Sequence, residues 1–397
     1  MYTKEEVLDF IQEEDVKFIR LAFFDISGKQ KNISIMPSEL PRAFNEGISF
    51  DASAILGFET PDKSDLFLQP DPSTLAVLPW RPSTGKVVRM LCNIKNPDGT
   101  PYKKDYRYLL KCAIKEARDT CALEIFIGAE VEFYLFKLNE KGEPTKEPFD
   151  QAGYMDIAPE DKGENIRRDI CFTLEQMGIM PEASHHEEGP GQNEIDFHYS
   201  DALTAADNTA TFKWIVRTKA AANGLFADFS PKPLPEKPGS GMHINISYKS
   251  LKHDDKTDYL PYMLGGIIKH IEEMTYYLNP TEESYERLGE FKAPKYISWG
   301  KENRSTLIRV PSSKNDMRFE IRSSDPSCNP YLAFALVIYA AIDGIKNKIT
   351  PPEPVLNNLF NEDSTSGLKM LPDTIDLART FAANSSFIKD ILSKTFK

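Results

Sequence analysis

The sequence lacks any apolar run long enough to span a bilayer, since the longest one extends only from Tyr331 to Ile342. It shows no signal peptide, because the first predicted helix is charged throughout. Basic residues are the minority: 48 Lys and Arg stand against 60 Asp and Glu, for a net charge of −12. This balance argues against nucleic acid or an anionic membrane as the main partner. We therefore expect a cytoplasmic protein with neither of these partners.

Cysteine is also scarce, with five residues and no CxxC pair among 397 residues. An odd number of scattered cysteines predicts reduced thiols in a cytosolic protein. Neither a GxxxxGK[ST] nor a GxGxxG motif is present, so a nucleotide would have to bind by another route. The length is enough for two domains with a large core.

The first part of the chain has the pattern of a small α+β unit. Thr3 and Glu6 form a predicted capping box that opens an amphipathic helix. Four strands are expected after it, at residues 18–24, 32–36, 75–78 and 86–93. The turn-rich sequence Asn96-Pro97-Asp98-Gly99 predicts a boundary, which gives domains 1–98 and 99–397.

The second part alternates predicted helices with strands. A proline-rich, extended segment is expected at residues 225–237. The helices are expected at residues 105–119, 164–177, 207–223, 260–278 and 330–349.

Four stretches of this second part place chemically active side chains on one face of a strand. Each stretch alternates polar and apolar residues, so one face is apolar and the other polar. The polar faces hold Glu130 and Glu132; Gln192, Glu194 and Asp196; His243, Asn245 and Ser247; and Arg318, Glu320 and Arg322.

A sheet with such a face has two interpretations. A single acidic strand is most simply a solvated edge, but four strands together favour a chemical site. Carboxylate oxygens with one imidazole suit Mg²⁺ or Mn²⁺ better than a closed zinc site. Arginines beside them suit phosphate or carboxylate, which a guanidinium binds in bidentate fashion. The pattern predicts phosphoryl transfer.

Other candidate residues are weaker when taken singly. Asp51 is a possible catalytic acid, but alone it is better read as a turn or cap residue. Arg287, Arg304 and Arg309 lie in a segment with a loop-like pattern and extend the arginine set. The histidines other than His243 have no ligand spacing to it, and we expect structural or surface roles for them.

Several long motifs resemble the glutamine synthetase family, in particular its bacterial type I form. They include HHEEGPGQNEIDF, PKPLPEKPGSGMH, ENRSTLIRVP and RFEIRSSDPSCNPYLAFA, and they occur in the family's order. The resemblance implies an N-terminal β-grasp domain, a catalytic domain with a curved antiparallel sheet and surrounding helices, and a site for two or more divalent ions. It also implies a homo-oligomeric ring whose active sites lie between subunits.

The resemblance also implies roles for individual residues. One ion would be held by Glu132, Glu187 and Glu194, and the other by Glu130, His243 and Glu320. Asp51 would arrive from the neighbouring subunit at the ammonium site. The implied substrate ATP would be bound by Glu182, Asn245, Ser247, Arg309 and Arg318. Glutamate would be held by Gly239, Arg287, Arg304 and Arg322, with Arg304 also serving catalysis.

The chain departs from the family's pattern in the flap, which reads Arg287-Leu-Gly-Glu-Phe-Lys-Ala-Pro294. The flap is one residue shorter, and Lys292 stands where the family has a catalytic glutamate. Glu290 is then a candidate base, while Lys292 is a candidate partner for an acidic group. Pro238 replaces an asparagine. The sequence stops short of a C-terminal segment that helps join two rings, which predicts a single or loosely held double ring.

Three functions follow as alternatives. The first is ATP-dependent ligation of glutamate to ammonia through a γ-glutamyl phosphate. The second is a γ-glutamyl ligase for another amine or acid, which the altered flap and Pro238 favour. The third is a catalytically weak homologue with a binding or structural role.

Overall fold

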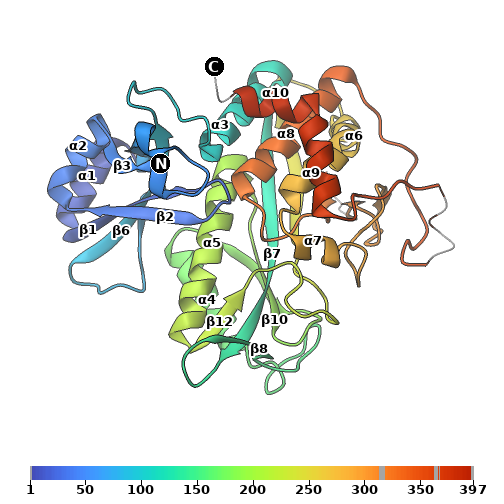
Figure 1. Cartoon of the computed structure of the whole chain (residues 1–397), viewed down its shortest axis with the longest axis horizontal. Coiled ribbons are helices and arrows are strands. Elements are labelled where there is room, and N and C mark those ends of the chain that lie inside the picture. Colours follow the sequence, from blue (N-terminus) through green and yellow to red (C-terminus); the bar gives the residue numbers. More distant parts are fainter. Residues whose placement is uncertain (1, 313–317, 362–364, 366, 395–397) are drawn as a thin grey trace.

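The computed structural model describes residues 2–312, 318–361, 365 and 367–394. Two sheets organise these residues, a smaller one in the N-terminal part and a larger one in the remainder. Figure 1 shows the N-terminal unit (blue) on one side of the molecule, next to helices α3 (Tyr106–Glu116) and α5 (Ala202–Ala222). Helices surround the long strand β7 (Leu123–Leu138), which runs through the centre of the larger part.

The N-terminal unit begins with helix α1 (Lys4–Glu13), whose start is the predicted capping box. The Glu6 amide donates to the Thr3 hydroxyl over 3.2 Å, and the Thr3 amide donates to the Glu6 carboxylate over 2.7 Å. The predicted strands are confirmed with shifted ends, and β1 pairs antiparallel with β2 but parallel with β6. The strands of this sheet are β1 (Val16–Phe24), β2 (Gln30–Ile35), β3 (Ile48–Asp51), β4 (Asp65–Pro70), β5 (Ala76–Val77) and β6 (Lys86–Lys95).

The four strands predicted to carry the chemical face are neighbours in the larger sheet. Their order is β16-β13-β7-β10, within the longer order β14-β15-β16-β13-β7-β10-β9. The sheet contains β9 (Pro181–His186), β10 (Gln192–Phe197), β13 (Met242–Ser250), β14 (Trp299–Lys301), β15 (Ile308–Val310) and β16 (Phe319–Ile321). Shorter strands β8 (Pro144–Pro148), β11 (Ser200–Asp201) and β12 (Leu225–Asp228) pair with β7.

The predicted helices are confirmed, and their ends differ by a few residues. α5 begins at Ala202, five residues before its predicted start, because Asp201 caps it by accepting from the Thr204 amide over 3.1 Å. The other helices are α2 (Leu40–Asn45), α4 (Glu164–Gln176), α6 (Leu260–Leu278), α7 (Glu282–Arg287), α8 (Pro330–Asn347), α9 (Ile375–Asn384) and α10 (Ser386–Lys394).

The apolar face of the large sheet packs against buried helices. Ile195 and Phe197 of β10 point into the core, opposite the polar face, as their alternation predicted. Helix α8 is buried along most of its length and packs against α6 and α3. The N-terminal unit has its own apolar cluster, which includes Val7, Ile19 and Leu68.

One sequence expectation about the fold is wrong. The segment that holds Arg287, Arg304 and Arg309 is not a loop throughout, because Arg287 ends helix α7 and Arg309 lies in strand β15. Only Arg304 occupies a turn between strands. The five cysteines are free in the structure. Among the described helices, none combines the length and apolar character that crossing a membrane requires.

Candidate active site

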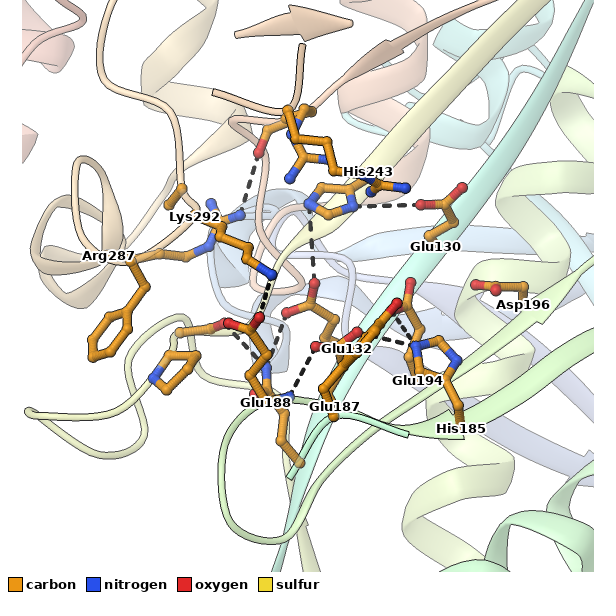
Figure 2. A pocket seen from close by; sticks show the side chains of 18 of the residues that line it. Glu130, Glu132, His185, Glu187, Glu188, Glu194, Asp196, His243, Arg287 and Lys292 are labelled. Atoms are coloured by element: carbon orange, nitrogen blue, oxygen red, sulfur yellow. Dashed lines mark hydrogen bonds and ion pairs between the residues drawn. The ribbon is translucent and has the colours of Figure 1, made fainter. Parts of the chain in front are cut away.

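A cavity of about 490 Å³ opens over the polar face of the large sheet. Figure 2 shows carboxylates from β7 and β10 converging on it together with His243 of β13 and His185 of β9. The flap residues after α7 line the opposite side, with Glu290, Phe291 and Lys292. Of the predicted polar faces, those of β7 and β10 line this cavity together, whereas β13 contributes His243 alone and the fourth contributes only Arg322, just after β16.

Glu130, His243 and Glu320 form one group of possible metal ligands, as predicted for the second ion. Strand pairing brings them together, because His243 lies directly opposite Glu130 in the β13–β7 register. His243 Nδ1 lies 3.4 Å from Glu130 Oε2 and 3.4 Å from Glu320 Oε1.

The residues predicted for the other ion divide between two groups. Glu132 and Glu194 are register partners on β7 and β10 and form a group with His243. Glu187 instead groups with Glu194 and His185, whose Nε2 lies 3.0 Å from Glu187 Oε1 and 3.5 Å from Glu194 Oε2. Glu194 belongs to both groups and links them.

The acidic groups of the cavity repel one another. Burial and the neighbouring carboxylates, Glu132 first, raise the pKa of Glu194 well above its usual range. Burial and Glu130 raise the pKa of Asp196 to about 7. A cluster of this kind must hold protons or cations near neutral pH. Because its donors are carboxylate oxygens and imidazole nitrogens, the residues fit a divalent ion.

Glu320 behaves differently because arginines surround it. Arg309 Nη1 donates to Glu320 Oε2 over 2.9 Å, and Arg322 Nη1 donates to Oε1 over 2.6 Å. Burial by itself would raise the pKa of Glu320. The positive charges of His243 and these arginines outweigh it and lower the pKa of Glu320 to about 2. Both guanidinium groups are therefore engaged by a carboxylate within the chain.

The other two arginines predicted for glutamate binding differ in burial. Arg287 is buried and donates to the Ser323 carbonyl over 2.8 Å and to the Arg322 carbonyl over 3.2 Å. Arg304 lines the cavity, is exposed, and makes no ion pair with any residue that the structure describes. It is the arginine most available to an anionic ligand.

The flap is a tight turn that directly follows Arg287. The Glu290 amide donates to the Arg287 carbonyl over 3.1 Å, and the Ala293 amide donates to the Glu290 carbonyl over 3.0 Å. Lys292 Nζ forms an ion pair with Glu188 and lies 5.6 Å from the centroid of the Tyr154 ring. Figure 2 shows the lysine reaching toward Glu188 at one side of the acidic cluster.

The predicted nucleotide residues lie outside the lining of this cavity. Asn245 Nδ2 donates to Glu130 Oε1 over 2.8 Å, so it orients a predicted metal ligand. Ser247 lies farther along β13 and pairs in register with Phe126. Arg318 is exposed just before β16. Glu182 is exposed on β9, where its carboxylate lies 3.7 Å from His198 Nδ1.

Asp51 also lies outside the cavity. It caps a short 3₁₀ helix (Ala52–Ala54) by accepting from the Ser53 amide over 2.9 Å and from the Ser53 hydroxyl over 2.6 Å. This is the cap role expected for the residue on its own. Within one chain Asp51 is exposed and does not line the site.

Three polar residues that line the cavity, His185, Glu188 and Tyr154, are not among the predicted site residues. His185 was assigned a structural or surface role, yet it faces the acidic cluster. Its alternation with Glu187 along the chain was an available signal, because such residues share a face. Glu188 and Tyr154 come from loops, where no periodicity marks them.

Gly239, which lines the cavity, lies too close to neighbouring atoms for a larger residue to fit without movement. A Cβ at Gly239 would lie 2.3 Å from the Pro231 carbonyl oxygen and 2.8 Å from Arg287 Cγ. The side-chain amide of Gln192 donates from Nε2 to the Gly239 carbonyl over 3.2 Å and to Glu132 Oε2 over 3.0 Å. Pro238 contributes its carbonyl, which accepts from the Tyr134 hydroxyl over 2.5 Å.

An α+β chain whose sheet gathers carboxylates, imidazoles and guanidinium groups in one cavity has the features of a metal-dependent enzyme for anionic substrates. Family comparison gives the particular family. The glutamine synthetase catalytic domain matches residues 103–397, and the glutamine synthetase beta-Grasp domain matches residues 15–97. The chain belongs to the glutamine synthetase family.

Relatives match over nearly the whole chain. A glutamine synthetase of Methanosarcina mazei is 46% identical over 407 residues, covering 99% of this chain and 91% of the relative. One of Staphylococcus aureus is 44% identical, covering 98% and 91%. A solved structure of a GmaS/ADP complex superposes with a TM-score of 0.89 at 27% identity, covering 98% and 92%. The structure of Plasmodium falciparum glutamine synthetase has the same fold, with a TM-score of 0.85 at 23% identity. The match covers 100% of this chain and 95% of the Plasmodium chain.

Proposed function

We propose that the protein catalyses ATP-dependent formation of glutamine from glutamate and ammonia. The observation that carries this proposal is the 46% identity to a glutamine synthetase over 99% of the chain. The cavity supports it, because the groups over the sheet are those that bind metal, phosphate and carboxylate. The expected ligase activity therefore has a matching site.

The cofactor in this proposal is Mg²⁺ or Mn²⁺, with two or more ions per site. Glu130, His243 and Glu320 would hold one ion. Glu132, Glu187 and Glu194 would hold a second ion. Bound divalent cations neutralise the phosphates of ATP and remove the repulsion between these carboxylates. We add His185 as a group that orients Glu187 and Glu194.

The substrates in this proposal are anions that meet the arginines. Arg304 would bind glutamate, with the Gly239 backbone, Arg287 and Arg322 beside it. Arg309 and Arg318 would meet the ATP phosphates, and Asn245, Ser247 and Glu182 would lie toward the nucleotide. The likeness to a complex that contains ADP supports nucleotide binding by this chain.

The proposed chemistry has two steps. An oxygen of the glutamate γ-carboxylate forms a bond to the γ-phosphorus of ATP, the bond to the bridging oxygen breaks, and ADP leaves. Ammonia then attacks the carbonyl carbon of the acyl phosphate, the bond from this carbon to the phosphate oxygen breaks, and inorganic phosphate leaves. Ammonium must first lose a proton to a base. Glu290 is the base we propose, because it lines the cavity within the flap.

Another amine or acid substrate is the second candidate. The specific observation in its favour is Lys292, a cation that lines the cavity where the family pattern has a glutamate. A lysine at this position suits a substrate with an additional acidic group. A weak or non-catalytic homologue is the remaining alternative and predicts ATP binding without turnover.

The proposed assembly is a homo-oligomeric ring in which Asp51 completes a neighbour's site. Leu56, five residues after Asp51, has 83% of its surface exposed in the single chain. An exposed leucine in the same segment supports a subunit contact there. Mass measurement should find an oligomer, and a fully active monomer would contradict the arrangement.

A substrate panel tests the proposed reaction. Phosphate release from ATP is measured with glutamate plus ammonium, and with other acids and other amines in place of each. Glutamate with ammonium should be the best pair. A different best pair would favour the second candidate, and ATP binding without phosphate release from any pair would favour the third.

A further inference from the structure

A second cavity lies between the N-terminal sheet and helix α5. Its volume is about 650 Å³, and it shares no lining residue with the candidate active site. Strand β6 contributes Arg89 and Leu91, and the first turns of α5 line the other side. Ser73, Thr74, Thr204, Asn208 and Thr211 also line it. The hydroxyls of Ser73, Thr74 and Thr211 already donate to Asp71 or to the Asp207 carbonyl.

Arg89 is the unusual residue of this cavity, because it is buried with almost no partners. Only 5% of its surface is exposed. Its guanidinium makes a single hydrogen bond, from Nη2 to the Thr211 hydroxyl over 3.3 Å, and Nε has no partner. No carboxylate in the described part of the chain forms an ion pair with it. A guanidinium has five N–H donors, and buried charges are normally paired.

The acidic residues that line the cavity are already engaged. Asp207 accepts from Arg107 Nε over 3.0 Å, from Arg107 Nη2 over 2.8 Å and from the Tyr331 hydroxyl over 2.6 Å. Asp201 caps α5, and Glu6 belongs to the capping box of α1. Arg107 pairs with both Asp71 and Asp207, and Asp207 attracts Arg89 only through space, so Arg89 has no direct ion pair with a described carboxylate.

We propose that this cavity binds a small oxyanion, a carboxylate or a phosphate group, held by the Arg89 guanidinium together with the polar side chains of Thr204 and Asn208. The N-terminal end of α5 adds to the attraction, because the helix dipole favours an anion there. The ligand would contact β6 of the N-terminal unit and α5 of the catalytic part together. Its binding would stabilise the junction of these two parts. This site is independent of the proposed reaction.

The test measures the unfolding temperature of the metal-free protein with inorganic phosphate and, separately, with acetate at constant ionic strength. Wild type is compared with Arg89→Met, which keeps the length of the side chain but removes its charge. Arg304→Gln is the control for anions bound in the active site. We expect wild type and Arg304→Gln to be stabilised by at least one probe, and Arg89→Met to lose that response.

Stability without the probes provides a second readout. Arg89→Met should unfold at the same or a higher temperature than wild type, because it removes a buried charge that has no direct ion pair. If Arg89→Met does not fold, Arg89→Lys is measured instead. It keeps the positive charge but lacks the planar guanidinium, so it should respond more weakly than wild type. A response to phosphate alone identifies a phosphate group, and a response to acetate alone identifies a carboxylate. An equal response in wild type and variant, or no response to either probe, overturns the proposal.

Discussion

Lys292 and Glu188 form an ion pair at the cavity although they lie 104 residues apart in the chain. Lys292 belongs to the flap after α7, and Glu188 to the turn between β9 and β10. The pair therefore connects the flap to the strands that carry the acidic cluster.

Lys292→Glu should weaken ligation, because it places two carboxylates opposite each other where an ion pair stood. We expect the KM for ammonium to rise by about 10-fold, which corresponds to about 1.4 kcal/mol. The double variant Lys292→Glu with Glu188→Lys reverses the pair and should recover most of the loss. A rise in glutamine formation in the single variant would show instead that position 292 is where the base belongs.

Glu290→Gln should lower kcat for glutamine formation by about 100-fold or more, the usual contribution of a general base. Nucleotide binding should persist, because the side chain keeps its size and the flap turn is made by backbone groups. Glu286→Gln, on helix α7 and outside the cavity lining, is the matched control. Unchanged turnover in Glu290→Gln would remove it as the base and favour Asp51 of a neighbouring subunit.

The chemical face of the sheet was predictable because strand alternation has a period of two. Glu130 with Glu132, and Glu194 with Asp196, fall on one side whatever the partner strand is. The ligand grouping was not predictable, since it depends on register. His185 meets Glu194 only through the β10–β9 pairing. The contact of Lys292 with Glu188 joins two turns, for which sequence provides no register at all.

Glu187→Ala should lower metal-dependent activity by more than about 100-fold, because Glu187 is one of the carboxylates grouped around Glu194. Metal affinity, measured by titration with Mn²⁺, should fall in parallel. Glu175→Ala on helix α4 is a control, because Glu175 is exposed and does not line the cavity. Unchanged metal affinity in Glu187→Ala would show that the cage is assembled from other residues.

Gly239→Ala should impair glutamate binding. The added Cβ would meet the Pro231 carbonyl oxygen at 2.3 Å and Arg287 Cγ at 2.8 Å, so backbone or arginine must move. Overpacking of this kind costs about 1–3 kcal/mol, and we expect the KM for glutamate to rise by about 10-fold. Gly153→Ala is the matched control, because its Cβ would meet its nearest neighbour at an ordinary 3.5 Å. Equal KM values for both variants would contradict a role for the Gly239 backbone in the site.

His186 should make the stability of the protein depend on pH. Its side chain is fully buried, with Nε2 2.9 Å from Asp150 Oδ1 and Nδ1 2.6 Å from the Glu187 carbonyl. Burial by itself would lower the pKa of His186. The hydrogen bond to Asp150 outweighs burial, so the pKa of His186 is raised overall. Two acceptors at the two ring nitrogens suit the imidazolium form, which donates from both.

A histidine with a raised folded-state pKa stabilises the folded protein below its unfolded pKa of about 6.5. This contribution is lost as pH rises through the folded-state pKa. We therefore expect His186→Gln to lower the free energy of unfolding most strongly below about pH 6.5, by about 3 kcal/mol for a broken buried pair. The difference from wild type should shrink toward alkaline pH. Denaturant unfolding of both proteins from below about pH 6.5 to alkaline pH, without added metal, measures this difference in free energy. A difference that is constant with pH would show that His186 is neutral in the folded state.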